Sequence, residues 1–300
     1  PMASHIISPK NLAKLQENLV VSHAVGMGEP IRSDFVLAAM IIRLNMFAKG
    51  YSGVSPELVK HLQLFINKRI IPSIPEHGAV GTSGDLVQLA HIALALIGKS
   101  INLKKFGVKA YVLKPKEGLA LINGTAVMSG IGAIVCDDAE RLVDLATRMG
   151  ALALELVAAF EDGISETLHD VRPHAGQKKI AKNLRALLAS SRLLRKRDAL
   201  NKHNGHNEYD TREIPEDVQE VYSLRCIPQI LGPVVDILTK VQKDIEVEIN
   251  SVSDNPVIDW KNGQFLHGGN FHGDVVAAAL DQLKISLVKL TMLSERRINF

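Results

Sequence analysis

Apolar residues recur at helical spacing along most of this chain. Proline-free runs with that spacing cover residues 125–160 and 273–299, and a third run over 230–252 has Pro233 near its first turn, where proline costs nothing. In the run over 273–299, the apolar positions on one face are Val276, Leu280, Leu283, Leu287 and Leu290. The alternation typical of strands is almost absent. The pattern therefore predicts an all-α fold, a single mostly helical domain over residues 1–300 built as an elongated bundle of long helices.

The composition narrows the class of protein further. The 300 residues are 46% hydrophobic and 22% charged with a formal net charge of +3, so the chain can bury a large core and nothing indicates a nucleic-acid partner. Two cysteines are too few for a disulfide framework, which favours the cytoplasm, and the first residues show no signal-peptide pattern. The longest uncharged run, 118–136, contains Asn123 and several glycines, so it predicts a buried loop entering a core helix and not a membrane span.

Polar residues gather in the breaks between the predicted helices, near residues 71–84, 114–125, 203–229 and 251–273. Loops on a rigid helical scaffold are where sites are commonly built. No metal site is expected in them, because the histidine pairs of the chain lack Cys, Asp or Glu at ligand spacing. The pairs considered are His169 with His174 and His203 with His206.

One break holds the turn Gly-Thr-Ser-Gly-Asp at 81–85, which runs directly into an apolar helical stretch. Ser83 or Asp85 can cap that helix by accepting from its first amides, and such caps are common. The same turn also suits a reactive site, because Gly84 lets its amide approach a neighbouring carbonyl and Ser83 can lose its hydroxyl as water. A helix N-terminus also favours an electrophile or an anion. The turn alone leaves both interpretations open.

Other breaks carry polar groups that packing does not require. Asn123 lies at a glycine-flanked turn, and residues 268–273 form a second glycine-rich turn ahead of a helix. Tyr222 and Arg225 are three residues apart, which places them on one side of a helical turn. Since arginine offers a bidentate fork, this pair suits a substrate with a carboxylate. An anchor and an amide of this kind favour the chemical interpretation of the turn at 81–85.

Five motifs, in this order, resemble those of the aromatic amino-acid ammonia-lyases and the related aminomutases. They are Gly-Thr-Ser-Gly-Asp-Leu at 81–86, Lys-Glu-Gly-Leu-Ala-Leu-Ile-Asn-Gly-Thr at 116–125, Tyr-Ser-Leu-Arg-Cys-x-Pro-Gln at 222–229, Ser-Asp-Asn-Pro at 253–256 and Gly-Asn-Phe-His-Gly at 269–273. The resemblance runs over nearly the whole chain and implies the helical core of the fumarase/aspartase-like superfamily. It also implies an amino-acid substrate, no external cofactor, and a homotetramer whose active sites are shared between subunits.

The resemblance implies that Thr82-Ser83-Gly84 cyclises to a 4-methylidene-imidazol-5-one, called MIO, which is the family's built-in electrophile. The amide nitrogen of Gly84 would attack the carbonyl of Thr82, and Ser83 would lose water to leave an exocyclic methylene. Thr82 occupies the position where the family usually has alanine, but its side chain would only be a substituent on the ring and should not prevent ring closure. The substrate amine would then add to the methylene and become a good leaving group while a base removes the β-proton.

The same resemblance assigns roles to further residues. Arg225 would hold the substrate carboxylate, and Asn123 would assist at the MIO and carboxylate end. Tyr222 and Gln219 would contact the MIO or the bound amine, and Phe271 would form a wall of the site. These roles depend on the family and not on the spacing of the residues.

Ser22 and His23 match the position that sorts the family's substrates by their ring. Histidine ammonia-lyases and some bacterial tyrosine-acting members carry Ser-His there, whereas typical phenylalanine enzymes carry bulkier apolar residues. The expected reaction is therefore elimination of ammonia from histidine to give urocanate, with tyrosine and then phenylalanine as alternatives. An aminomutase or an inactive helical scaffold would use the same residues, so both stay open.

The chain also departs from the family pattern. The family's catalytic tyrosine lies in a Tyr-Gly-Val-Asn-Thr-Gly-Phe-Gly-like loop that would precede Pro1, and a further acidic site residue lies in a part that would follow a segment like 293–298. The stretch 100–116 is shorter than usual. We therefore expect this chain to be a fragment of a longer enzyme, with the base for the β-proton outside these residues, or else a truncated relative that lacks this base.

Overall fold

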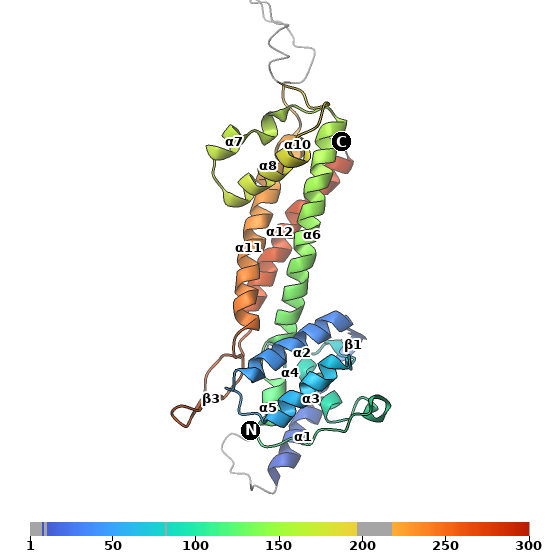
Figure 1. Ribbon diagram of the computed structural model, residues 1–300, viewed down its shortest axis with the longest axis vertical. Helices are drawn as coiled ribbons and strands as arrows, with labels where there is room; N and C mark the ends of the chain where they lie inside the picture. The colour runs from blue at the N-terminus through green and yellow to red at the C-terminus, as the bar shows by residue number, and fades with distance from the viewer. Residues whose placement is uncertain (1–7, 9–10, 82, 197–217, 300) are drawn as a thin grey trace, which may run out of the picture. The chain divides into compact units, whose positions relative to one another are not determined.

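The computed structural model describes residues 8, 11–81, 83–196 and 218–299, and this part of the chain is mostly helical (Figure 1). The helices up to residue 125 are α1 (Leu12–His23), α2 (Ser33–Ala48), α3 (Pro56–Asn67), α4 (Leu86–Leu96), the 3-10 helix η2 (Leu103–Phe106) and α5 (Glu117–Ile122). They are followed by α6 (Ala126–Leu156), the 3-10 helix η3 (Glu161–Ile164), α7 (Glu166–Asp170), α8 (Ala175–Leu187), α10 (Tyr222–Arg225), α11 (Ile227–Ile249) and α12 (Asp274–Ile298). The predicted all-α fold is confirmed.

The described strands are short and form two antiparallel pairs. In the first pair β1 (Met27–Pro30) meets β2 (Pro75–His77), with Met27 opposite His77 and an irregular register up to Pro30. In the second pair β3 (Val257–Asp259) and β4 (Gln264–Leu266) form a hairpin with Ile258 opposite Phe265. Gly263 has a φ of +66° in the hairpin turn, a conformation that favours glycine.

Two helix boundaries differ from the sequence prediction. The helix α11 begins at Ile227 and not near Ile230, so Pro233 lies inside it, because the amide of Ile230 already donates to the carbonyl of Cys226 at 3.0 Å. The break expected over 114–125 contains the short helix α5, which starts after Lys116, a residue with a φ of +70°. Both differences arise from local hydrogen bonds that an apolar pattern does not record.

The chain divides into two compact units. The first unit contains residues 1–135 and 243–279, and the second contains 136–242 and 280–300. The boundaries fall inside the long helices α6, α11 and α12. The single domain expected from the sequence stays a prediction.

The first unit has a core of aliphatic and aromatic side chains from α1 to α6. The largest fully buried apolar members are Met40, Met46, Leu58, Leu62, Phe65, Ile70, Ile74, Leu89, Leu96, Leu121 and Ile122. Burying a side chain of this size stabilises a fold by roughly 1.5–3 kcal/mol. Polar loops are therefore held on a rigid base in this unit.

The second unit buries one stripe from each of α6, α8, α11 and α12. Its core includes Val143, Leu154, Ile180, Leu184, Ile227, Leu231, Leu290 and Leu293. The backbones of α8 and α11 touch, because a Cβ on Gly176 would lie 2.1 Å from the carbonyl oxygen of Gly232. None of the described helices is both long and apolar enough to cross a membrane.

Candidate active site

The turn that contains Ser83 and Gly84 lies backbone to backbone against the loop at Gly124. Ser83 and Gly84 have φ values of +60° and +71°. The amide of Gly124 donates to the carbonyl of Ser83 at 3.2 Å, and the amide of Asp85 donates to the carbonyl of Gly124 at 2.8 Å. A Cβ on Gly84 would lie 2.3 Å from the oxygen of Gly124 and 3.0 Å from that of Phe271. Position 84 therefore requires glycine, and Thr82 lies outside the described residues.

Asp85 anchors this turn to a different helix from the one predicted. It precedes α4 but makes no side-chain cap to that helix, and its Oδ2 accepts from the amides of Val127 and Met128 at 2.7 and 2.9 Å. Of the two residues that could cap this helix, Asp85 does not do so, because the first amides of α6 compete successfully for its carboxylate. Burial raises the pKa of Asp85 to about 6, although those two amides and the charge of Arg43 oppose this effect.

Asn123 is buried beside the same turn, and its Nδ2 and its backbone carbonyl are bonded to neighbouring residues. Its Nδ2 donates to Oδ1 of Asp254 and to the carbonyl of Asn255, each at 3.2 Å. Its own carbonyl accepts from Nη1 of Arg43 at 2.8 Å. Arg43 is fully buried, which lowers its pKa to about 10, while the charges of Asp254 and Asp85 act in the opposite direction. The amide and the turn are thus held in one polar network.

Phe271, Ser22 and His23 also belong to the first unit. The carbonyl of Phe271 faces Gly84, as the distance above shows. Ser22 and His23 lie at the end of α1, where Oγ of Ser22 and Nδ1 of His23 both bond the carbonyl of Leu19, at 3.1 and 2.7 Å. The described contacts join Phe271 to the turn but do not join this serine and histidine to it.

Gln219, Tyr222 and Arg225 line one cavity of about 680 Å³ in the second unit. Nη1 of Arg225 donates to Oε1 of Gln219, and the guanidinium lies 4.7 Å from the centre of the Tyr222 ring. Nε of Arg225 and Oε1 of Gln229 are buried in this cavity wall and have no hydrogen-bond partner among the described residues. The unpartnered Nε of this guanidinium suits a ligand carboxylate, whereas Oε1 of Gln229 suits a ligand donor such as an amine.

The remaining chemistry-bearing groups are explained by packing or lie apart from these two clusters. His169 uses both ring nitrogens, with Nε2 3.1 Å from the carbonyl of Gly163 and Nδ1 2.9 Å from Nε2 of Gln177. Across the described residues no group of three or more His, Cys, Asp or Glu could hold a metal ion. His203 and His206 lie outside the described residues.

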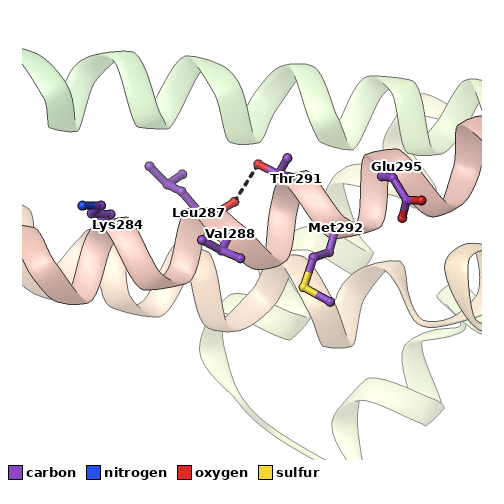
Figure 2. A pocket seen from close by; sticks show the side chains of 6 residues that line it. All are labelled: Lys284, Leu287, Val288, Thr291, Met292 and Glu295. Atoms are coloured by element: carbon purple, nitrogen blue, oxygen red, sulfur yellow. Dashed lines mark hydrogen bonds between the residues drawn. The ribbon is translucent and has the colours of Figure 1, made fainter.

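A separate hollow of about 390 Å³ lies on α12 and contains none of the predicted site residues (Figure 2). Val288 and Met292 line it together with Thr291, whose hydroxyl donates to the carbonyl of Leu287 at 3.1 Å. Its polar ends, Lys284 and Glu295, are far apart along the helix, so this hollow offers no cluster of reactive groups.

Sequence reasoning placed the turn, Asn123 and Arg225 but gave no role to Asp254, Lys116 or Arg43. Asp254 belongs to the Ser-Asp-Asn-Pro motif at 253–256, but its contacts do not follow from the sequence because its partners are distant in the chain. Arg43 could have been noticed as a lone charge on an apolar helix face, since a buried arginine is rare unless it has a partner.

Comparison with known proteins places the chain in a family. The aromatic amino acid lyase family matches residues 1–300, so the chain belongs to the aromatic amino acid lyases. It is 39% identical to histidine ammonia-lyase of Caldanaerobacter subterraneus subsp. tengcongensis, over 98% of this chain and 57% of that protein. It is 41% identical to a probable histidine ammonia-lyase of Thermoplasma volcanium, over 97% of this chain and 58% of that protein. The chain thus spans somewhat more than half the length of these relatives.

Solved structures of the same fold include both lyases and aminomutases. Tyrosine aminomutase from Streptomyces globisporus has a TM-score of 0.91 at 36% identity, covering 98% of this chain and 58% of that one. Histidine ammonia-lyase from Trypanosoma cruzi has a TM-score of 0.84 at 34% identity, covering 99% and 55%. The fold is therefore that of the aromatic amino acid lyases and aminomutases, which share it across different activities.

Proposed function

We propose that the protein containing this chain eliminates ammonia from an aromatic L-amino acid, with histidine to urocanate as the leading reaction. The observation that carries the proposal is the Ser83-Gly84 turn, which is held against Gly124 and lies beside the buried amide of Asn123. Its relatives named histidine ammonia-lyase support the histidine ring, as does the Ser22-His23 pair at the end of α1. Tyrosine and phenylalanine are the alternative substrates, and the cytoplasm is the expected compartment.

The residues of the turn fit the MIO group that the family uses. Gly84, whose amide would close the ring, has no Cβ to meet Gly124, and its backbone is already in a left-handed conformation that favours glycine. Asp85 fixes the C-terminal end of the turn through α6. When formed from Thr82-Ser83-Gly84, MIO supplies an electrophile for the substrate amine, and no external cofactor is needed.

The chain's own residues bind and orient the substrate. Arg225 offers a charged, planar donor for the carboxylate, while Gln219 and Tyr222 line the same cavity and can contact the amine end. Asn123 presents a fixed amide beside the turn, and Phe271 closes one side of it. Removal of the β-proton needs a base, and we assign this role to a residue outside the described residues of this chain.

A homotetramer with shared active sites is part of the same proposal. The helix α6 exposes Leu142, Leu145, Met149, Leu152 and Leu156, which recur alternately three and four residues apart. This spacing is typical of a seam that packs against another helix, and exposed stripes of this length usually meet a partner. Sedimentation of the full-length protein gives the number of subunits directly.

The deciding experiment combines turnover with the mass of the turn. Full-length protein is incubated with histidine, tyrosine and phenylalanine, and the conjugated acid is followed by its ultraviolet absorbance. The peptide that contains Ser83 should be lighter by two waters. Ser83→Ala removes the hydroxyl that must leave, so the mass loss should disappear and turnover should fall by on the order of 10⁴-fold, as on loss of a covalent catalytic group.

A matched control and the failing outcomes make this test decisive. Ser294→Ala changes a serine that only bonds its own helix, from Oγ to the carbonyl of Leu290, so it should keep full turnover. A ring without turnover of any of the three amino acids would sink the lyase assignment. An unmodified turn in the wild type would instead support an inactive scaffold.

An aminomutase is the second candidate, because tyrosine aminomutase of Streptomyces globisporus is among the similar structures. It would return ammonia to the β-carbon and give a β-amino acid. Chromatography of the products separates the two activities, since a lyase accumulates free unsaturated acid and ammonia.

A further inference from the structure

Asp254 connects the two ends of α5 in the first unit. Its Oδ2 accepts from Nζ of Lys116 at 2.6 Å, and its Oδ1 accepts from Nδ2 of Asn123 at 3.2 Å. Lys116 and Asn123 are the residues that flank this short helix on its N- and C-terminal sides. One carboxylate therefore fixes both ends of α5, and with them the place of the Asn123 side chain.

The neighbours of Asn123 also determine which way its amide points. An ionised carboxylate and a backbone carbonyl can only accept, so the group that faces Asp254 and the carbonyl of Asn255 must be Nδ2 with its two hydrogens. The orientation follows from this chemistry and needs no observed hydrogen positions. Without the Asp254 carboxylate, Asn123 would lose one of the two acceptors that hold it in this orientation.

Burial makes this arrangement rigid. The Asp254 side chain is 0% exposed and that of Lys116 is 15% exposed, so little water is present to replace either partner. Oδ1 of Asp254 also accepts from the amide of Asn255 at 2.7 Å, which fixes the carboxylate relative to its own backbone. Lys116 supplies the opposite charge that a buried carboxylate requires.

We propose that Asp254 is the positioning residue for Asn123, and that Lys116 acts with it by neutralising its charge. This inference rests on the proposed function, in which Asn123 acts beside the turn at Ser83. It gives a role to a residue that touches neither the turn nor the cavity of Arg225 in the contacts described above. Groups that orient a reacting side chain in this way typically change activity by about 10–100-fold when removed.

The test is a double-mutant cycle between Asp254 and Asn123 in the full-length enzyme. Asp254→Asn keeps the shape but has one amide oxygen where Lys116 and Asn123 need two acceptor atoms. We expect kcat per ring-bearing subunit to fall by about 10–100-fold, with the mass of the turn still lower by two waters. In an Asn123→Ala background, Asp254→Asn should cause no further fall, because it acts through Asn123.

An exposed ion pair in the same unit provides the control for this cycle. Glu57→Gln removes an exposed ion pair with Lys114 in the same unit and should change neither kcat nor the ring. Equal losses from Asp254→Asn with and without Asn123 would overturn the inference, as would an unchanged kcat in the single variant. A wild type without turnover would defeat the proposed function as well, whereas an active wild type with additive losses would defeat only this inference.

Lys116→Met provides a second test of the proposal if the Asp254→Asn variant does not fold. It leaves the carboxylate able to accept from Asn123, so the loss of kcat should be smaller, a few-fold, and should again vanish in the Asn123→Ala background. A loss that persists in that background would show that Lys116 and Asp254 support the fold alone, and would overturn the proposal.

Discussion

The two clusters of predicted site residues differ in how their polar groups are satisfied. In the first unit, Asp85, Asn123 and Asp254 are buried and bonded to named partners, so each is held in place by the protein itself. In the second unit, Tyr222 is 71% exposed, and Nε of Arg225 and Oε1 of Gln229 have no partner within the part of the chain that the structure describes.

The polar groups of the first unit are therefore preorganised by the protein, whereas the cavity of the second unit has polar atoms that a bound ligand can pair. Buried polar atoms are normally paired, so unpaired atoms in a cavity wall indicate a place for a bound molecule. The first unit has its own exception, because Nε and Nη2 of Arg43 are also unpaired. That guanidinium nevertheless holds the carbonyl of Asn123, so it belongs to the network around the turn. Substitutions in the first unit should therefore lower stability, and those in the cavity should weaken binding.

The largest expected effect comes from adding one methyl group to the turn. Gly84 and Gly81 both have a φ of +71°, but a Cβ on Gly84 would meet Gly124 whereas one on Gly81 would meet nothing within 4 Å. Gly81→Ala should cost about 1 kcal/mol through its backbone conformation alone. Gly84→Ala adds a backbone overlap and should cost more than about 3 kcal/mol in the free energy of unfolding.

Urea denaturation of both variants measures the two costs, and the mass of the turn shows whether the ring still forms. Because the φ values match, the difference between the variants reports the close approach to Gly124. Equal costs would mean that the loop at Gly124 moves away easily, and the first unit would then be no more rigid than the cavity in the second.

Local features of this site could be predicted from the sequence. The turn at 81–85 and the pair of Tyr222 and Arg225 depend on residues that are neighbours in the chain, and the helical spacing of apolar residues gave the bounds of α12 almost unchanged. Such features depend on propensity and spacing, which one sequence displays.

The network around Asn123 could not be predicted in the same way. Asp85 bonds an amide 42 residues away, Arg43 bonds a carbonyl 80 residues away, and Lys116 meets Asp254 across 138 residues. Nothing in the local pattern marks these partners, because tertiary packing brings them together. Asp85, one of two possible caps for α4 on the sequence alone, does not cap that helix for this reason, since a more distant helix takes its carboxylate.

Acid should act in opposite directions on the two units. The folded pKa of Asp85, about 6, lies above its ordinary value of 3.8, so the native chain binds more protons than the unfolded chain between these values. Stability therefore falls as pH rises through this window, by about 3 kcal/mol at most. Burial lowers the pKa of His169, so here the unfolded chain binds more protons and stability falls as pH drops below 6.5.

Unfolding by urea from pH 4 to pH 8 separates these two contributions. Asp85→Asn should gain stability relative to the wild type as pH rises from 4 to about 6, with no further gain above that. His169→Gln can still donate to Gly163 and accept from Gln177, so it should remove the loss at acid pH. Variant and wild-type curves that stay parallel over the whole range would contradict the assignment of either residue.

The smallest expected effect is specific to binding, and it comes from Arg225→Lys in the cavity of the second unit. Lysine keeps the charge but loses the planar fork and the buried Nε, so KM should rise by roughly 10–100-fold while the free energy of unfolding changes by less than about 1 kcal/mol. Arg148→Lys is the matched control, because that arginine forms only an exposed ion pair with Asp144 on α6 in the same unit. Steady-state kinetics with the preferred amino acid measures KM and kcat separately. A fall in kcat at unchanged KM would mean that Arg225 acts only in the transition state. A large loss of stability would mean that Arg225 supports the fold, as the preformed network does in the first unit.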